Sequence, residues 1–317
     1  MIWRSALSLV SRDRLSILIF HRILGKPDPL LPGEPSASEF EALVRHLSVR
    51  FTVLALSEAV QQLQSGTLPV GALSITFDDG YADNLSVAAP ILQKYGLCAT
   101  IFVATGQLDG GCMWNDLVIE AFRSTHHSDL DLTSLALGKH ALGTVVDRRS
   151  AVDRVLGAIK YLPPAERGRK AQEILRTAAV APPGDLMLTR DGLRSLSQSG
   201  FEIGAHTVRH PILASISTDE AWTEISESKR DLEQLLGRTV TLFAYPNGQP
   251  GRDYTVEHVR MVSEAGFAAA ASTAIGAASR KSDVLQLPRF TPWSRRPVKF
   301  DLLMLRNLCT GVERQAA

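Results

Sequence analysis

Four apolar runs of the sequence end directly in polar residues that could do chemistry. These residues are His21, the pair Asp78-Asp79, His206 and the tripeptide Tyr245-Pro246-Asn247. In α/β barrels the catalytic groups lie at the carboxyl ends of parallel strands. One such coincidence carries little weight, but four of them predict a single shared functional surface.

Two histidines stand four residues apart in the segment His206-Thr207-Val208-Arg209-His210-Pro211. Pro211 disfavours helical geometry at His210, so we expect a structured loop or a single turn. Imidazoles at this spacing can converge on one metal ion, and two surface histidines by chance are the alternative for this segment alone. With a carboxylate from another strand end, they match the ligand set of a catalytic zinc-type site, which lacks the fourth protein ligand of a structural one.

The carboxylate pair is followed by a glycine, in Thr76-Phe77-Asp78-Asp79-Gly80. Adjacent side chains of a regular strand point to opposite faces, so two neighbouring carboxylates would not normally share a site. Gly80 permits a sharp departure from strand geometry, which would let both carboxylates reach one pocket. A strand that ends in an ordinary Asp-Gly turn is the alternative for this segment alone.

The elements that must position these residues alternate along the chain. Apolar runs predict strands at residues 15–20, 51–54, 73–77, 98–103, 201–205, 240–244, 267–272 and 285–290. Helical patterns lie between most of them, and a capping box from Ser38 to Glu41 is expected to open the first. Seven or eight strand–helix units in one run predict an α/β fold, a distorted (β/α)7–8 TIM-like barrel, as a single domain over residues 1–317.

The alternation breaks between about residues 106 and 188. This stretch carries helical patterns at 115–122, 150–162 and 165–178 but no clear buried strand, and it closes with the loop signal Pro182-Pro183-Gly184. We therefore expect a helical insertion into the barrel without a core of its own.

Two separated motifs, TFDDG at Thr76–Gly80 and HTVRHP at His206–Pro211, each lie at the end of a predicted strand. Together they resemble the polysaccharide deacetylase family, the NodB-homology domain of carbohydrate esterase family 4. The resemblance implies a distorted barrel over nearly the whole chain outside the insertion. It implies that Asp78 is the catalytic base. The implied ligands of a divalent metal, zinc first with cobalt, nickel or manganese as alternatives, are Asp79, His206 and His210.

The segment from Phe243 to Gly248, FAYPNG, resembles the family's third motif with two departures. Ala244 stands where an arginine usually holds the catalytic base, and Arg289 in the last predicted strand is the candidate replacement. Asn247 stands where a tyrosine is usual. In the family that tyrosine contributes its backbone N–H to the oxyanion hole, so the resemblance implies that Asn247 can supply the same group.

The family's last motif, a Leu-x-His near the C-terminus, is absent, because no histidine follows His258. The run Leu18-Ile19-Phe20-His21 instead supplies a histidine near the N-terminus, as in the circularly permuted branch that includes poly-N-acetylglucosamine deacetylases. The first and last strands of a closed barrel are neighbours, so either placement can put the imidazole in the same place. The resemblance implies that His21 is the general acid, and a purely structural histidine is the alternative. The sequence does not identify its carboxylate partner.

Four aromatic residues near the motifs or in the insertion could contact the faces of sugar rings. They are Tyr81, Trp114, Tyr245 and Trp293. A place in the hydrophobic core is the alternative for each of them. Asp116 follows Trp114 at the start of a predicted helix, and we interpret it as a charge at the helix N-terminus rather than a ligand.

The composition and charge exclude several classes of protein. With 34 Lys and Arg against 33 Asp and Glu, the chain has no electrostatic footprint for nucleic acid. Its three cysteines, none in a Cys-x-x-Cys spacing, cannot build a disulfide framework. No convincing signal peptide and no transmembrane segment is found in the sequence. We expect a cytoplasmic protein, with a peripheral position at the inner face of the membrane as one option.

These observations favour a metal-dependent hydrolase that removes N-acetyl groups from an amino-sugar-containing polysaccharide or glycoconjugate precursor. Its partner would be an acetylated amino-sugar oligosaccharide or polysaccharide, or a lipid-linked or nucleotide-linked precursor. The same barrel could instead serve an amidohydrolase or de-O-acetylase that acts on a small molecule. A carbohydrate-binding pseudoenzyme is the third alternative, kept open by Ala244 in the arginine position.

Overall fold

A central sheet of mostly parallel strands organises the chain. The computed structural model describes residues 7–291, 297–310 and 315–316. The strands of the central sheet are β1 Arg14–Phe20, β2 Thr52–Val53, β3 Ala72–Phe77, β4 Thr100–Val103, β7 Glu202–Ala205, β8 Leu242–Ala244, β9 Ala269–Ile275, β10 Ala278–Ser279 and β11 Leu287–Arg289. Their aliphatic, aromatic and β-branched residues form the short buried runs that the sequence pattern predicts.

The sheet curls into a barrel. Its strand order is β10-β1-β3-β4-β7-β8-β9-β11, with β2 paired to β3. A parallel bridge joins Phe290, directly after β11, to Leu18 of β1, and the Phe290 N–H donates to the Ile17 carbonyl at 2.8 Å. Apart from β10, which pairs antiparallel with β1, the strands are parallel. The prediction of a distorted TIM-like barrel is therefore confirmed.

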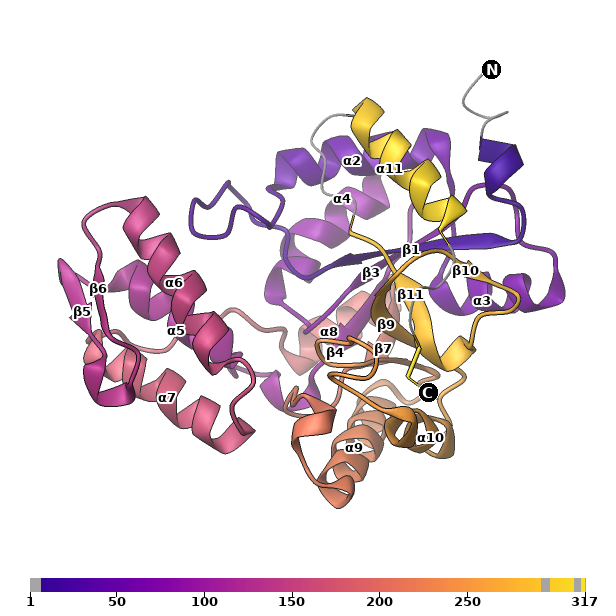
Figure 1. Cartoon of the computed structure of the whole chain (residues 1–317). Coiled ribbons are helices and arrows are strands. Elements are labelled where there is room, and N and C mark those ends of the chain that lie inside the picture. The colour runs from indigo at the N-terminus through magenta and orange to yellow at the C-terminus, as the bar shows by residue number, and fades with distance from the viewer. Residues whose placement is uncertain (1–6, 292–296, 311–314, 317) are drawn as a thin grey trace.

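Helices cover the outside of the sheet (Figure 1). They are α2 Ala37–Arg50, α3 Leu56–Ser65, α4 Ala89–Lys94, α8 Arg190–Gln198, α9 Thr218–Leu236, α10 Val256–Glu264 and α11 Pro297–Cys309. A π-helical turn, Asn84–Ala88, precedes α4. The capping box of α2 is Ser36 with Glu39, two residues earlier than predicted, because both serines have a glutamate three positions later. No helix of the described residues is long and apolar enough to cross a membrane.

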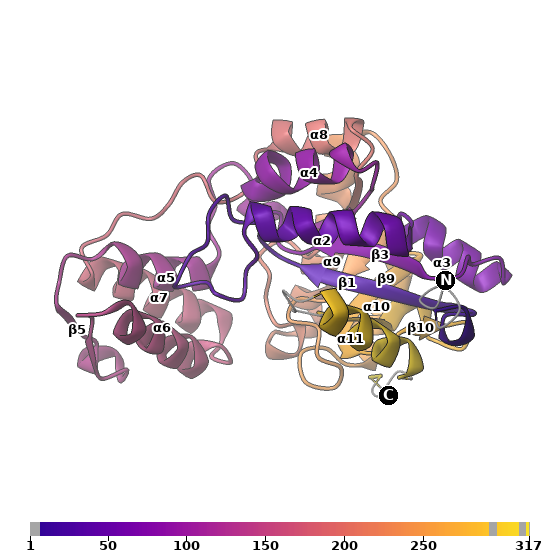
Figure 2. The same ribbon diagram turned by 90° about the horizontal axis from the view of Figure 1, so that it is seen from above.

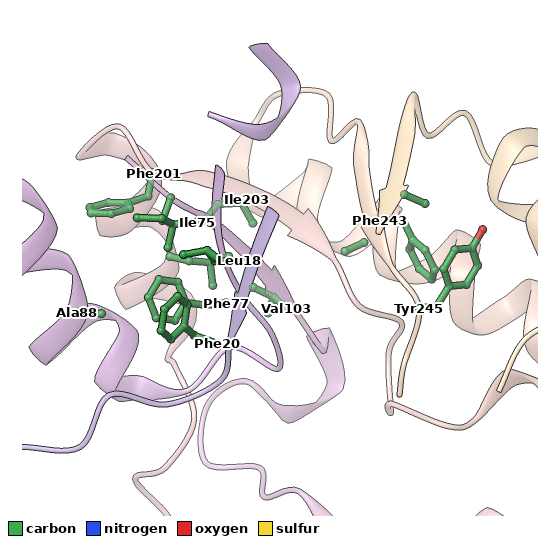
Figure 3. Packing of buried hydrophobic residues seen from close by; sticks show 14 of the residues in the cluster. Leu18, Phe20, Ile75, Phe77, Ala88, Val103, Phe201, Ile203, Phe243 and Tyr245 are labelled. Carbon is green, nitrogen blue, oxygen red and sulfur yellow. The ribbon is translucent and has the colours of Figure 1, made fainter. Parts of the chain in front are cut away.

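Outward-facing residues of the strands form the main hydrophobic core beneath the helices. Phe20 and Phe77, neighbours in register, stack at 5.5 Å (Figure 3). Phe40 of α2 packs edge-on against both. The inward-facing residues form a second cluster of alanines and larger aliphatic residues, in which the ring of Phe102 packs against Gly204. A Cβ on Gly204 would lie 2.5 Å from that ring, so this strand position requires glycine.

The insertion forms a lobe beside the barrel (Figure 1). Its elements are α5 Trp114–Ser124, β5 Asp129–Asp131, β6 Lys139–Ala141, α6 Val145–Ile159 and α7 Pro164–Thr177. Apolar faces of the three helices bury a separate cluster that includes Val118, Phe122, Val155 and Ile174. The expectation that the insertion has no core of its own is therefore wrong. The reason is that each helix is amphipathic and the three pack against one another rather than against the sheet.

The lobe contacts two loops that follow barrel strands, the loop after β1 and the loop after β8. Arg123 of α5 forms an ion pair of 2.5 Å with Asp28, in the loop after β1. Figure 2 shows this loop lying beside the lobe. On the α6–α7 connection, the ring of Tyr161 lies 4.0 Å from the guanidinium carbon of Arg252, which follows β8.

Candidate active site

Strand pairing places the polar strand ends at one edge of the barrel. Phe20 pairs with Phe77 in parallel register, and the Asp78 N–H donates to the Phe20 carbonyl at 2.9 Å. Ala205 pairs with both Val103 and Phe243, which brings the ends of β4, β7 and β8 to the same level. The residues that follow β1, β3, β7 and β8 therefore meet at this carboxyl edge.

Both carboxylates after β3 reach one site because the backbone turns sharply behind them. Asp78 and Asp79 are 3% and 6% exposed. Asp79 and Gly80 have positive φ angles of 74° and 85°. A Cβ on Gly80 would lie 3.1 Å from the side chain of Val103, so glycine suits this turn in both conformation and space. The departure from strand geometry expected at Gly80 is present.

One oxygen of Asp79 and the Nε2 atoms of His206 and His210 face one another. The two Nε2 atoms are 3.1 Å apart, and Asp79 Oδ1 lies 3.5 Å from that of His206 and 3.3 Å from that of His210. A tetrahedral ion with bonds of roughly 2.0–2.1 Å holds its ligands about 3.3–3.4 Å apart. The three atoms have the spacing of three corners of such a site. Within the described residues, they form the one group of three or more His, Cys, Asp or Glu that could hold a metal ion.

Two further observations fit a cation at this point. Asp79 Oδ1 is buried and receives no hydrogen bond from the described residues, and a buried acceptor without a partner is costly. His206 Nδ1–H donates to the carbonyl of Ala244 at 2.7 Å, in the tautomer that this contact requires. The lone pair of Nε2 is then available to a metal, and a second bond of this kind orients most metal-binding histidines.

The loop that carries the two histidines is held in an unusual backbone conformation. Thr207 and His210 have positive φ angles of 63° and 58°. The His210 N–H donates to Thr207 Oγ1 at 3.1 Å. Glu224 of α9, which is 2% exposed, accepts hydrogen bonds from the N–H groups of Val208 and Arg209 at 2.9 and 2.7 Å. Nothing in the sequence around Glu224 predicts this contact, because an acidic residue in the middle of a long helix carries no local signal of it.

Charge and burial act together on the ionisable groups of the site. Burial lowers the pKa of His210, and although the charge of Asp79 opposes this, the pKa falls to about 3. Burial also lowers the pKa of His206, but Asp78 and Asp79 raise it by more, so it lies above the ordinary value. Burial raises the pKa of Asp79, and His210, His206 and His21 together hold it well below its usual range.

Arg289 of β11 lies fully buried against Asp78. Its two terminal nitrogens donate to the two carboxylate oxygens at 2.6 and 2.7 Å, and its Nε–H donates to the carbonyl of Ser272 at 2.8 Å. Burial raises the pKa of Asp78, but Arg289 and then His206 lower it by more, so the carboxylate stays ionised. The structure thus puts an arginine against this carboxylate, although Ala244 stands in the usual position.

His21 follows β1 and lies among carboxylates. Its backbone carbonyl accepts a hydrogen bond from Asn84 Nδ2 at 2.9 Å. Its charge acts on Asp78, Asp79 and Glu34. Glu34 lies in the loop after β1, and burial raises its pKa while the charge of His21 lowers it. Glu34 is thus one of three carboxylates on which the charge of His21 acts.

Asn247 stands in a tight turn beyond β8, with a positive φ of 58°. Its carbonyl accepts a hydrogen bond from Thr273 Oγ1 at 2.8 Å, and the Gly248 carbonyl accepts one from the Thr273 N–H at 2.8 Å. These two bonds fix the turn against β9. Within the described part of the chain, the Asn247 N–H forms no hydrogen bond.

Two of the four aromatic residues are placed in the core instead of facing a substrate. Tyr245 is fully buried, stacks on Tyr254 at a ring separation of 3.8 Å and donates its hydroxyl to the Leu285 carbonyl. Tyr81 is 2% exposed and donates its hydroxyl to Asp116 at 3.0 Å. The prediction that these two rings contact sugar is wrong, because neither presents a face to solvent.

Of the other two aromatic residues, the structure describes Trp114 but not Trp293. Trp114 is partly buried in the first turn of α5, and its ring lies 4.9 Å from the guanidinium carbon of Arg167. A role in substrate contact therefore stays a proposal for Trp114. Trp293 lies outside the described residues.

Asp116 lies in the first turn of α5, as predicted, and its carboxylate is buried, 3% exposed. Burial raises its pKa to about 7, although the charge of Arg22 opposes this. The folded protein binds the proton more tightly than the unfolded chain, so this group destabilises the fold as pH rises. Replacement by asparagine, Asp116→Asn, should therefore stabilise the metal-free protein. The gain should grow by about 1.4 kcal/mol per pH unit up to about pH 7.

Urea unfolding in the presence of a chelator, at pH 5, 6, 7 and 8, measures this difference in the free energy of unfolding. The control is Asp191→Asn, which changes an exposed carboxylate on α8 and should show no trend with pH. A constant difference between wild type and Asp116→Asn across this range would contradict the prediction.

The fold and the site together define a barrel hydrolase with a two-histidine, one-carboxylate cluster at its carboxyl edge. A family model described as "Polysaccharide deacetylase" matches residues 65–134 and 160–270, more than half of the chain. The chain therefore belongs to the polysaccharide deacetylase family. It is a hydrolase of the kind that removes N-acetyl groups from carbohydrates.

Individual relatives are distant in sequence but similar in fold. The Bacillus subtilis protein YxkH, named as a candidate polysaccharide deacetylase, is 23% identical over 87% of this chain and 70% of its own length. The solved structure of the deacetylase PplD from Streptococcus pyogenes, in complex with acetate, has a TM-score of 0.62 at 20% identity, over 93% of this chain and 98% of its own. That of IcaB from Ammonifex degensii has a TM-score of 0.59 at 18% identity, over 94% and 98%.

Proposed function

We propose that this protein is a metal-dependent hydrolase that removes N-acetyl groups from an amino-sugar-containing polysaccharide or glycoconjugate precursor. The observation that carries the proposal is the mutual spacing of 3.1 to 3.5 Å between three ligand atoms of Asp79, His206 and His210. The neighbouring carboxylate of Asp78 is ionised, and it is not one of the three ligand atoms.

The three residues would hold a divalent metal, zinc first and cobalt, nickel or manganese as alternatives. Two imidazoles and one carboxylate suit zinc at an open, catalytic position. A bound metal there would supply Lewis acidity for the acetyl carbonyl and lower the pKa of a water molecule. Burial lowers the pKa of His210 and the histidines lower the pKa of Asp79, which favours the charge states that metal ligands need. Asp78 and Asp79 raise the pKa of His206, so a metal would compete with a proton there.

The remaining roles belong to side chains and backbone groups of this chain. Asp78 accepts a proton from the attacking water, and Arg289 fixes the orientation of its carboxylate through two hydrogen bonds. His21 donates a proton to the departing amine. The free N–H of Asn247 donates to the oxyanion that develops on the acetyl carbonyl.

The substrate is an acetylated amino-sugar oligosaccharide or polysaccharide, or a lipid-linked or nucleotide-linked precursor. The acetate in the S. pyogenes deacetylase structure, the product of deacetylation, supports chemistry on an acetyl group. The ion pair between Arg289 and Asp78 argues against the pseudoenzyme alternative, which the alanine at Ala244 had kept open. The cytoplasmic location stays a prediction from sequence that fractionation of the native protein tests.

Acetate release tests the proposal. The purified protein with added zinc is incubated with N-acetylglucosamine oligomers and, separately, with acetylated small-molecule amides and O-acetyl esters. We expect acetate from the oligomers, loss of release on addition of a chelator, and recovery when zinc is restored. Release from the small molecules alone would support the small-molecule alternative, and release that persists in chelator would contradict metal dependence.

A further inference from the structure

One buried cation of the insertion forms no ion pair with any carboxylate that the structure describes. Arg167, in the first turn of α7, is 4% exposed. Within the described residues, no carboxylate lies within ion-pair distance of its guanidinium. Burial lowers its pKa, and no neighbouring charge opposes this. A buried charge is retained only where other groups compensate its loss of hydration.

Two contacts of Arg167 compensate only part of that loss. One terminal nitrogen donates to the carbonyl of Lys160 at 3.0 Å, which caps the end of α6. The guanidinium carbon lies 4.9 Å from the centre of the Trp114 ring. A guanidinium has five N–H donors in a planar fork, and among the described residues only the Lys160 carbonyl accepts from it. Its remaining nitrogens are not among the enclosed side-chain atoms that lack a partner, so they face accessible space.

The position of Arg167 relates it to the active site. The α6–α7 connection just before it contacts the loop after β8, through Tyr161 and Arg252. Trp114, which packs beside Arg167, begins helix α5, and the same helix carries Asp116. Asp116 accepts a hydrogen bond from the hydroxyl of Tyr81, which lies two residues after Asp79. Arg167 therefore lies on the side of the lobe that borders the carboxyl edge of the barrel.

We propose that Arg167 binds an anionic group of the carbohydrate substrate, a carboxylate or a phosphate carried next to the acetylated amino sugar. This inference rests on the proposed function and narrows its substrate class to acidic glycans or phosphorylated precursors. The planar fork of an arginine matches both anions through paired hydrogen bonds, and the Trp114 ring packs beside the guanidinium. The insertion then supplies selectivity, while the barrel supplies the chemistry.

The test compares three probes on the zinc-loaded protein. One is a neutral N-acetylglucosamine oligomer, the second is an oligomer that contains N-acetylmuramic acid, with its carboxylate, and the third is an N-acetylglucosamine oligomer with a terminal phosphate. Wild type should have a kcat/KM at least tenfold higher on one of the two acidic probes than on the neutral one. The acidic probe with the higher kcat/KM shows whether the preferred anion is a carboxylate or a phosphate. Equal values on all three would overturn the proposal.

Variants of Arg167 test whether this residue causes the preference for acidic probes. Arg167→Gln should lose at least tenfold in kcat/KM on the preferred acidic probe, mainly through KM, and change less than threefold on the neutral probe. Arg167→Lys, which keeps the charge but not the fork, should fall in between. The matched control Arg169→Gln removes an exposed arginine two positions along the same helix and should change neither value. An equal loss on neutral and acidic probes would mean that Arg167 is only structural.

A binding measurement separates this inference from the proposed function. If the wild type releases no acetate from any probe, the proposed function fails, but calorimetric titration with N-acetylmuramic acid, N-acetylglucosamine 1-phosphate and N-acetylglucosamine still tests the anion site. We expect tighter binding of at least one acidic sugar by wild type and no such preference in Arg167→Gln. Absence of the preference in wild type would overturn the inference independently of catalysis.

Discussion

Replacement of Asp78 by asparagine is expected to lower kcat by about 10²–10⁴-fold, the range of a lost general base. Asparagine keeps the shape of the side chain but cannot accept the proton of water. The zinc content should remain that of wild type, because none of the three proposed ligand atoms is changed. Stopped assays of acetate release, with metal analysis of the same preparations, check both parts.

A stability control accompanies this variant, because Asp78→Asn leaves the charge of Arg289 buried without its partner. Such a loss costs about 3–5 kcal/mol in other proteins, so activity is compared only below the unfolding transition of each variant. The matched control is Asp301→Asn, which removes a carboxylate paired with His46 and Arg50 on α2, away from the site. It should keep full activity. An Asp78→Asn protein that is folded and fully active would exclude Asp78 as the base.

Loss of either Asp79 or His210 should remove metal and activity together. Asp79→Ala and His210→Ala each delete one of three ligands, so the affinity for zinc should fall below the level that survives dialysis. A metal contributes several kcal/mol to the transition state, and each ~1.4 kcal/mol is a factor of ten. We expect kcat/KM to fall by about 10³-fold or more, with metal analysis and acetate release as the two measurements.

The matched control is His46→Ala, which deletes a partly buried histidine paired with Asp301. Its zinc content and activity should equal those of wild type. Added zinc in excess should partly restore the ligand variants if their defect is affinity alone. Full activity in either ligand variant without bound metal would refute the assignment of the site.

The barrel could be predicted because its strands and helices carry independent local patterns. Apolar runs such as Leu15–Phe20 are buried strands, and glycine or capping signals mark the helices between them. Boundaries were less certain where two signals compete, as for Ser36 and Ser38 at the start of α2. The separate core of the insertion was missed because amphipathic spacing shows that a helix has an apolar face, not which surface covers that face.

The candidate site was predictable where one short segment carries both the residue and its backbone turn. Asp78, Asp79 and Gly80 are such a segment. Contacts between distant segments were harder: Arg289 was found only because a known motif lacked its arginine, and Glu224 gave no signal at all. The aromatic predictions for Tyr81 and Tyr245 failed because proximity in sequence to a motif does not determine whether a ring faces substrate or core.

The pairing of Asp78 with Arg289 spans 211 residues of chain. The three proposed metal ligands and the groups that hold them, Glu224 and the Ala244 carbonyl, all precede β9 in the chain. Asp78, by contrast, has no arginine beside it until β11 docks and Phe290 bridges to β1. Contacts of such separation form late, because the entropy of closing the chain must be overcome first. We therefore expect the proposed metal ligands to be in place before Asp78 is oriented, so that the last strand of the barrel completes the proposed site.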